Sequence, residues 1–216
     1  MRAGEARRPR SAAVPEGSDE VAREVRELAG LLHVGAPRLR VVDTPAPVLM
    51  VAGVRRPTLV VSRGTLARLD ARERRAALAH ELAHLARRDP LLGWVLMGCR
   101  LVAFFNPAVQ LVARAAVREL EWRADDLAAA TTADREALAS GLGKLAGAGE
   151  AGGAPARRRR LVRRLVAGLR ARAQDEAIRA RCRRLLEPDR GRGTAFARLR
   201  VALTGSALAL LLFFVV

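Results

Sequence analysis

The chain has 216 residues, half of them hydrophobic, which is enough for a core in one globular domain with attached segments. Its two cysteines cannot form the disulfide framework of a small secreted protein, and they suit a reducing compartment. The net charge of +17 favours an anionic partner such as a lipid headgroup or a nucleic acid. No zinc finger or aromatic RNA-binding pattern accompanies this charge, which disfavours nucleic acid.

The N-terminal part of the chain predicts a tail, a helix and a small sheet. Residues 1–17 are rich in Arg, Pro, Gly and Ala without an apolar run, so we expect a disordered tail and no signal peptide. Residues 19–32 have the periodicity of an amphipathic helix. Short apolar runs separated by Pro and Gly then predict three strands, over residues 38–43, 47–53 and 57–62.

Residues 71–88 predict a helix with a defined start and end. Asp70 and Glu73 have the spacing of a capping box, and Asp89-Pro90 marks the end. Leucines recur along it at intervals of three and four residues, which predicts the face that packs on the core. These leucines are Leu78, Leu82 and Leu85.

The same helix carries H-E-x-x-H, from His80 to His84, a pattern typical of zinc hydrolases. On a helix, residues four apart lie on one face, so both imidazoles can bind one ion at roughly 2.0 to 2.1 Å. Glu81 lies about a hundred degrees around the helix from His80, where it can reach a metal-bound water without binding the metal. We therefore predict His80 and His84 as metal ligands and Glu81 as the general base. The alternative is a solvated polar stripe, which the packed leucine face argues against.

An apolar segment and a second long helix follow. Residues 91–105 are shorter than the ~20 residues that span a bilayer and are interrupted by Arg100, so they predict a buried or membrane-dipping helix. Cys99, within this segment, is expected to be a buried and inert thiol. Asn106 and Pro107 form an N-cap and first-turn pair that starts the next helix.

A catalytic zinc site needs a third protein ligand, and the candidates in this chain are acidic residues or His33. Glu121 and Asp125 are four residues apart, so both carboxylates point the same way. We assign Glu121 as the third ligand and Asp125 as the acceptor of a hydrogen bond that orients a ligand imidazole. Glu119 lies about two hundred degrees from Glu121 and cannot face the same ion. Without the upstream histidines, pairing of these acids with neighbouring arginines would be the better interpretation.

The C-terminal part changes in composition. Residues 147–156 are rich in Gly and Ala and predict a flexible linker. Residues 157–200 predict a basic helical segment, since the stretch 155–200 holds sixteen arginines and four acidic residues, and we favour binding to anionic lipid headgroups over DNA. Residues 201–216 carry no charge and would extend about 24 Å as a helix, which predicts a C-terminal transmembrane segment, complete or cut short. Arginines just before it place the preceding residues in the cytoplasm.

These motifs together resemble one group of proteins. His80 to His84, Arg87-Arg88-Asp89, Phe105-Asn106-Pro107 and Glu121 to Asp125 are similar to the membrane-associated gluzincins. Two related families fit: the HtpX-like and CAAX prenyl endopeptidases, and the peptidase domain of beta-lactam sensor-transducers. The resemblance covers about residues 36–130. No third histidine follows at the metzincin spacing, which disfavours that class.

The resemblance implies peptide-bond hydrolysis in or near a membrane. It implies His80, His84 and Glu121 as zinc ligands, Glu81 as the base and Asp125 beside the ligands. In related proteases an edge strand holds the substrate by backbone pairing, and the run 47–53 is our candidate. The chain has no tyrosine, so the donor that stabilises the oxyanion would be His33 or an arginine, and the sequence does not choose between them.

We predict a mainly helical α+β fold: a zincin-like catalytic domain over residues 18–146, with its small sheet before the H-E-x-x-H helix, and a C-terminal transmembrane helix. The predicted function is a zinc-dependent endopeptidase with one Zn2+ per chain, in which Glu81 acts on a metal-activated water. Its expected partners are a protein or peptide substrate and the membrane, and its expected location is the cell membrane with the catalytic domain facing the cytoplasm. The alternative is a non-catalytic membrane-attached scaffold or nucleic-acid-binding module that uses the Arg-rich segment. The presence of Glu81 favours the enzyme, because a binding module would not need a base there.

Overall fold

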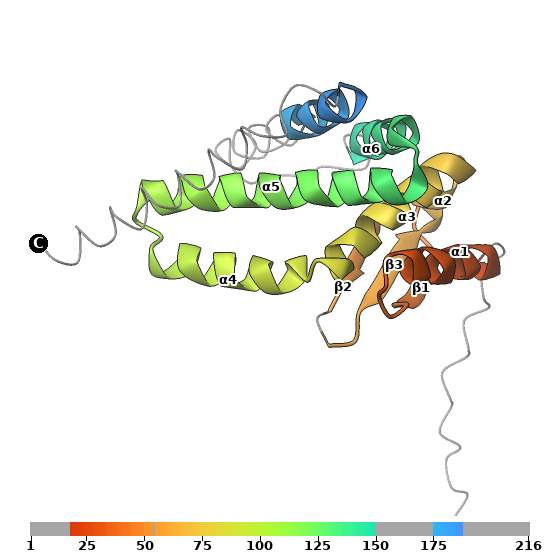
Figure 1. Cartoon of the computed structure of the whole chain (residues 1–216), viewed down its shortest axis with the longest axis horizontal. Helices are drawn as coiled ribbons and strands as arrows, with labels where there is room; N and C mark the ends of the chain where they lie inside the picture. The colour runs from red at the N-terminus through yellow and green to blue at the C-terminus, as the bar shows by residue number, and fades with distance from the viewer. Residues whose placement is uncertain (1–17, 54, 150–174, 188–216) are drawn as a thin grey trace, which may run out of the picture.

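The computed structural model describes residues 18–53, 55–149 and 175–187 (Figure 1). The elements follow in the order α1 (Ser18–Leu31), β1 (Arg38–Val42), β2 (Leu49–Ala52), β3 (Thr58–Ser62), α2 (Arg63–Leu66), α3 (Ala71–Ala86), α4 (Asp89–Val102), α5 (Pro107–Thr132) and α6 (Arg135–Gly149). A further helix covers residues 175–186. The prediction of a mainly helical α+β fold with a small sheet is confirmed.

The three strands form one sheet in the order β1-β3-β2. The central strand β3 pairs in parallel with β1 and antiparallel with β2. Each of the three predicted runs contains one of these strands, slightly shorter than expected. The strand β2 therefore lies at an edge of the sheet, next to α3.

The helix α3 begins where the sequence predicted and ends slightly earlier. The Asp70 side chain accepts a hydrogen bond from the Glu73 amide, and the Glu73 side chain accepts one from the Asp70 amide, which confirms the capping box. The predicted end was residue 88, but α3 ends at Ala86 because Arg88 adopts a left-handed backbone with φ 56°. The chain then turns directly into α4 at Asp89.

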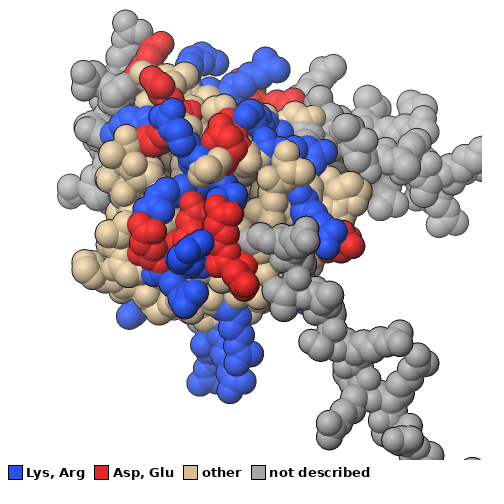
Figure 2. Space-filling model, turned by 90° about the vertical axis from the view of Figure 1, so that its right-hand side faces the viewer, with Lys and Arg blue, Asp and Glu red and all other residues tan. Residues whose placement is uncertain are grey.

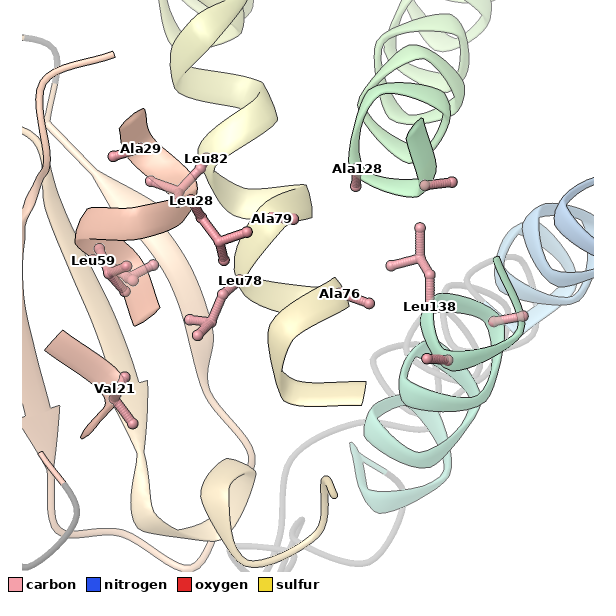
Figure 3. Close-up of a cluster of buried hydrophobic side chains, with 14 of the residues drawn as sticks. Val21, Leu28, Ala29, Leu59, Ala76, Leu78, Ala79, Leu82, Ala128 and Leu138 are labelled. Carbon is pink, nitrogen blue, oxygen red and sulfur yellow. The ribbon is translucent and has the colours of Figure 1, made fainter. Parts of the chain in front are cut away.

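The helix α3 is packed on both sides, as Figure 3 shows. Leu78 and Leu82 are fully buried and point toward α1 and the sheet, and Leu85 packs on the same core, so the predicted leucine face is confirmed. Each buried leucine stabilises the fold by roughly 1.5 to 3 kcal/mol. On the opposite side Ala76 and Ala79 face α5 and α6, where their small side chains let the helices approach closely. Packing from two sides holds the histidine-bearing helix rigidly.

The helices α4 and α5 lie side by side and extend away from the sheet (Figure 1). The predicted start of α5 is confirmed, because the Asn106 side chain accepts hydrogen bonds from the first amides of the helix. The apolar side chains of α4 are exposed, Trp94 to 63% and Leu101 to 68%, and so is Cys99. Burial of residues 91–105 and of Cys99 was therefore a wrong prediction: among the described elements α4 packs mainly on α3 and α5, and most of its large apolar side chains remain exposed. The membrane-dipping alternative stays a prediction.

Within the described ranges, no helix combines the length and the hydropathy needed to cross a bilayer. The predicted tail 1–17 and transmembrane segment 201–216 lie outside the described residues. Of the expected linker 147–156, the first residues belong to α6, which continues to Gly149. The basic segment 157–200 is described only over 175–187, where it is helical up to residue 186.

Candidate metal centre

Two helices bring three donor side chains together. His80 and His84 lie one turn apart on α3, and their Nε2 atoms are 3.2 Å apart. Glu121, on α5, places one carboxylate oxygen 3.6 Å from His80 Nε2 and the other 3.8 Å from His84 Nε2. One donor atom from each side chain lies within 4.8 Å of the other two. Two imidazole nitrogens and a carboxylate oxygen are a donor set that suits zinc, so this group could hold a metal ion.

In each imidazole, the Nδ1 atom, which is not the nitrogen nearest Glu121, contacts a carboxylate. Asp125 Oδ1 lies 3.0 Å from His80 Nδ1, and the Asp125 side chain is fully buried. Asp89 Oδ2 lies 2.9 Å from His84 Nδ1 and is also buried. When both Nδ1–H groups donate hydrogen bonds to carboxylates, both Nε2 atoms keep lone pairs that can bind one ion. The sequence interpretation used Asp89 as a helix end and as part of the family resemblance, and it did not predict this contact with His84.

The side chain of Glu81 lies against the edge strand. Its Oε2 accepts a hydrogen bond of 3.0 Å from the backbone amide of Val51 in β2. Burial raises the pKa of Glu81 above its ordinary value, although nearby His80 and His84 oppose the shift. A carboxylate with a raised pKa accepts a proton more readily near neutral pH, which suits a general base.

An arginine that the sequence did not single out lies in the same site. Arg181, from the helix 175–186, donates to both carboxylate oxygens of Asp125, at 2.8 and 2.6 Å. A further guanidinium nitrogen lies 2.8 Å from Glu121 Oε2. No local pattern separates Arg181 from the other arginines of its segment, so only the fold could reveal it. His33, the other histidine considered, is exposed after α1 and does not belong to the donor group.

The charges of the site are strongly coupled. Burial alone would lower the pKa of His80, but hydrogen bonds with Asp125 and Glu121 raise it to about 9. Burial would raise the pKa of Glu121 and of Asp125, yet His80 and Arg181 hold both below their ordinary values. The two acids are therefore ionised at neutral pH, and metal binding would have to displace the proton from His80.

Comparison with known proteins places this chain in a family. A family model described as BlaR1 peptidase M56 matches residues 33–151, more than half of the chain. The chain is 31% identical over 156 residues to "Protease HtpX homolog" of Ralstonia nicotianae, covering 57% of this chain and 54% of that protein. It is 30% identical over 162 residues to the protein of the same name from Bifidobacterium longum, covering 58% of this chain and 53% of the relative.

A third relative represents the other family of the predicted pair. The chain is 29% identical over 107 residues to "Regulatory protein BlaR1" of Bacillus licheniformis, covering 46% of this chain and 18% of that protein. The chain spans about half the length of the HtpX homologs that it matches. No solved structure gives a significant match. The predicted resemblance is confirmed, and the chain belongs to the BlaR1 peptidase M56 family.

Proposed function

We propose that this chain is a zinc-dependent endopeptidase that cuts protein substrates at a membrane. One observation carries the proposal. His80, His84 and Glu121 converge, and Glu81, which lies on α3 with the two histidines, contacts the edge strand β2. A metal-binding module without activity would need the three donors only. It would not need a half-buried carboxylate on the same helix whose pKa is raised.

The roles of the residues follow from this arrangement. His80, His84 and Glu121 hold the ion, one per chain, and Asp125 orients His80. When bound, zinc supplies Lewis acidity that polarises the scissile carbonyl and lowers the pKa of water toward ~7. Glu81 would take a proton from the attacking water, whose hydroxyl would add to the scissile carbonyl carbon, and would pass that proton to the amine as the C–N bond breaks, so no covalent intermediate with the protein would form.

The edge strand β2 is our candidate for the substrate-binding strand. Val48 accepts a hydrogen bond from the amide of Ser62, so its main chain faces β3. Alternate residues of a strand face opposite edges, and Leu49 and Val51 therefore turn their main-chain groups away from β3. The Val51 amide indeed meets Glu81. A peptide paired with the outer edge of β2 would lie beside the general base.

Location at a membrane is supported by the α4–α5 hairpin. Large apolar side chains are exposed along it and at its tip; they are Leu91, Leu92, Trp94, Val95, Met97, Leu101, Val102, Phe104, Phe105, Leu111 and Val117. Apolar surface of this extent on a soluble protein marks a site of contact with a protein or a membrane. We propose that it lies in the cell membrane with the metal site on the cytoplasmic side. The proposed anchor 201–216 and the lipid-binding role of the segment 157–200 rest on the sequence.

The charge on the described surface supports this function over nucleic-acid binding. On the face drawn in Figure 2, acidic side chains are interspersed among the basic ones. Arginines of α3 pair with acids of α1, such as Arg75 with Glu27 at 2.6 Å. This mixed surface differs from the basic stripe that follows a nucleic-acid backbone.

The proposal is tested by metal removal. The purified full-length chain, with fluorescently labelled casein as substrate, should lose cleavage after treatment with a zinc chelator and regain it when zinc is restored. Cleavage that persists in the metal-free protein would contradict the proposal. So would a wild-type protein that holds no zinc.

A further inference from the structure

The site contains a cation that comes from outside the family match. Arg181 lies on the helix 175–186, whereas the family model matches residues 33–151. The Arg181 side chain is only 12% exposed. Its guanidinium contacts a carboxylate on each of two successive turns of α5, Glu121 and Asp125.

The contact of Arg181 with Asp125 pairs a buried carboxylate with a cation. The Asp125 carboxylate is fully buried, and a buried acidic group is costly unless it is paired and hydrogen-bonded. Arg181 donates to both carboxylate oxygens in a bidentate geometry, which a guanidinium can form and an ammonium cannot. The same carboxylate meets His80 Nδ1 at 3.0 Å. A chain of contacts thus runs from Arg181 through Asp125 to the imidazole that should bind metal.

The second contact acts on a metal ligand directly. A guanidinium nitrogen of Arg181 lies 2.8 Å from Glu121 Oε2 and another lies 3.2 Å from His80 Nε2. In the metal-free protein this cation offsets part of the negative charge of the two acids. It also holds Glu121 beside the histidines, so the donors are in place before an ion arrives.

We propose that Arg181 is a positioning residue of the metal site and that the helix 175–186 completes this site. The inference rests on the metal site proposed above. Arg181 acts through Asp125 and Glu121, and its loss should weaken metal binding as loss of an outer hydrogen-bond partner does. Such losses lower metal affinity by about 10- to 100-fold.

The same helix offers a matched control. Arg184, one turn further along, pairs with Asp126 and with the backbone oxygen of Trp122, away from the donor group. Arg181→Met and Arg184→Met therefore remove equal charge and volume from one helix. Only the first removes a contact with the site.

The test measures zinc affinity of the purified full-length chain by competition with a chromophoric chelator. We expect Arg181→Met to weaken zinc binding by about 10- to 100-fold and Arg184→Met to leave it unchanged. The visible absorption of the cobalt-loaded protein gives a second readout and should change only in Arg181→Met. In a background carrying Asp125→Asn, the effect of Arg181→Met should shrink, because the partner is already altered.

Several outcomes would overturn the inference. Equal or tighter zinc binding by Arg181→Met, in a wild type that binds zinc, would show that the arginine does not position the donors and would leave the proposed function standing. A wild type that binds no zinc would remove both proposals. If Arg181→Met does not fold, Arg181→Lys is the alternative variant, because it keeps the charge but not the bidentate contact. It should still bind zinc more weakly than Arg184→Lys. Equal affinity in these two lysine variants would reject the inference as well.

Discussion

Glu119 and Glu121 on α5 show how half a turn of helix changes the surroundings of a carboxylate. Glu121 points into the donor group, within 3.8 Å of both histidine Nε2 atoms. Glu119 instead pairs with Arg123 at 2.8 Å, one turn further along. The two residues have the same chemistry and differ only in the face of the helix that they occupy.

This difference predicts the metal content of two variants. Glu121→Ala removes a donor and should weaken zinc binding well beyond the ~100-fold that loss of an outer partner costs. Glu119→Ala removes only an ion pair on the other face and should keep zinc. Zinc per chain after dialysis, measured by mass spectrometry, checks both. Retention of zinc by Glu121→Ala with its loss from Glu119→Ala would transfer the ligand role to Glu119.

At this scale the sequence predicted the residues that have a local signal and missed those that do not. His80, Glu81 and His84 were predicted from their spacing on one helix; the structure brings His80 and His84 together with Glu121 and sets Glu81 against the Val51 amide. Asp89 reaches His84 because Arg88 turns the chain with a positive φ, which spacing does not encode. Arg181 reaches the site through a tertiary contact over more than fifty residues.

At the scale of elements, α3 is joined to α6 by a buried acid. The Glu73 side chain, which caps α3, also accepts hydrogen bonds from Ser140 Oγ at 2.6 Å and Lys144 Nζ at 2.7 Å. Burial would raise the pKa of Glu73, but the contacts with Lys144, Ser140 and the Asp70 amide lower it below its ordinary value of 4.5. Folding therefore stabilises the ionised form.

Glu73→Gln should lower the free energy of unfolding by about 2 kcal/mol near neutral pH, because hydrogen bonds to a charged group are lost. A lowered pKa gives stability that is present above the ordinary value of 4.5 and lost as the pH falls through the folded-state pKa, so the deficit should shrink in acid. Urea unfolding of wild type and Glu73→Gln at neutral and acidic pH measures this loss of unfolding free energy. Glu27→Gln, which breaks an exposed pair with Arg75, is the control and should have a smaller effect. A deficit that is independent of pH would exclude the ionised contact as its cause.

The α4–α5 hairpin shows where an apolar run is ambiguous. The composition of residues 91–105 fits a buried helix as well as one that enters lipid. Only the arrangement of neighbouring helices shows that Trp94 and Phe104 are uncovered. Sequence periodicity could not reveal this, because both environments select the same side chains.

Insertion of the hairpin is testable through Trp94. With Trp122→Phe, Trp94 is the only tryptophan of the chain, and its emission should shift to shorter wavelength when vesicles of phosphatidylglycerol and phosphatidylcholine are added. A control carries Trp94→Phe, Trp122→Phe and Leu31→Trp, with the reporter at an exposed position of α1. Its emission should not shift. Vesicle binding without a shift of Trp94 would show that the hairpin stays in water.

At the scale of the whole molecule, the candidate metal centre lies where two layers meet. The sheet and α1 cover one side of α3, and α5 and α6 cover the other. His80 and His84 come from α3, Glu121 comes from α5, and β2 supplies the edge beside Glu81. The order of these elements along the chain could be predicted, because each has a local pattern. Their packing could not, because it depends on the alanine-lined contacts of α3 with α5 and α6.

The most direct test of the central claim is cleavage by Glu81→Gln. This change keeps the size of the side chain and leaves the proposed ligands His80, His84 and Glu121 intact. The account predicts a folded variant that holds one zinc per chain, as the wild type does, and cleaves labelled casein at least ~100-fold more slowly, because the proton acceptor is lost. Wild-type cleavage by the zinc-loaded Glu81→Gln variant would contradict the account.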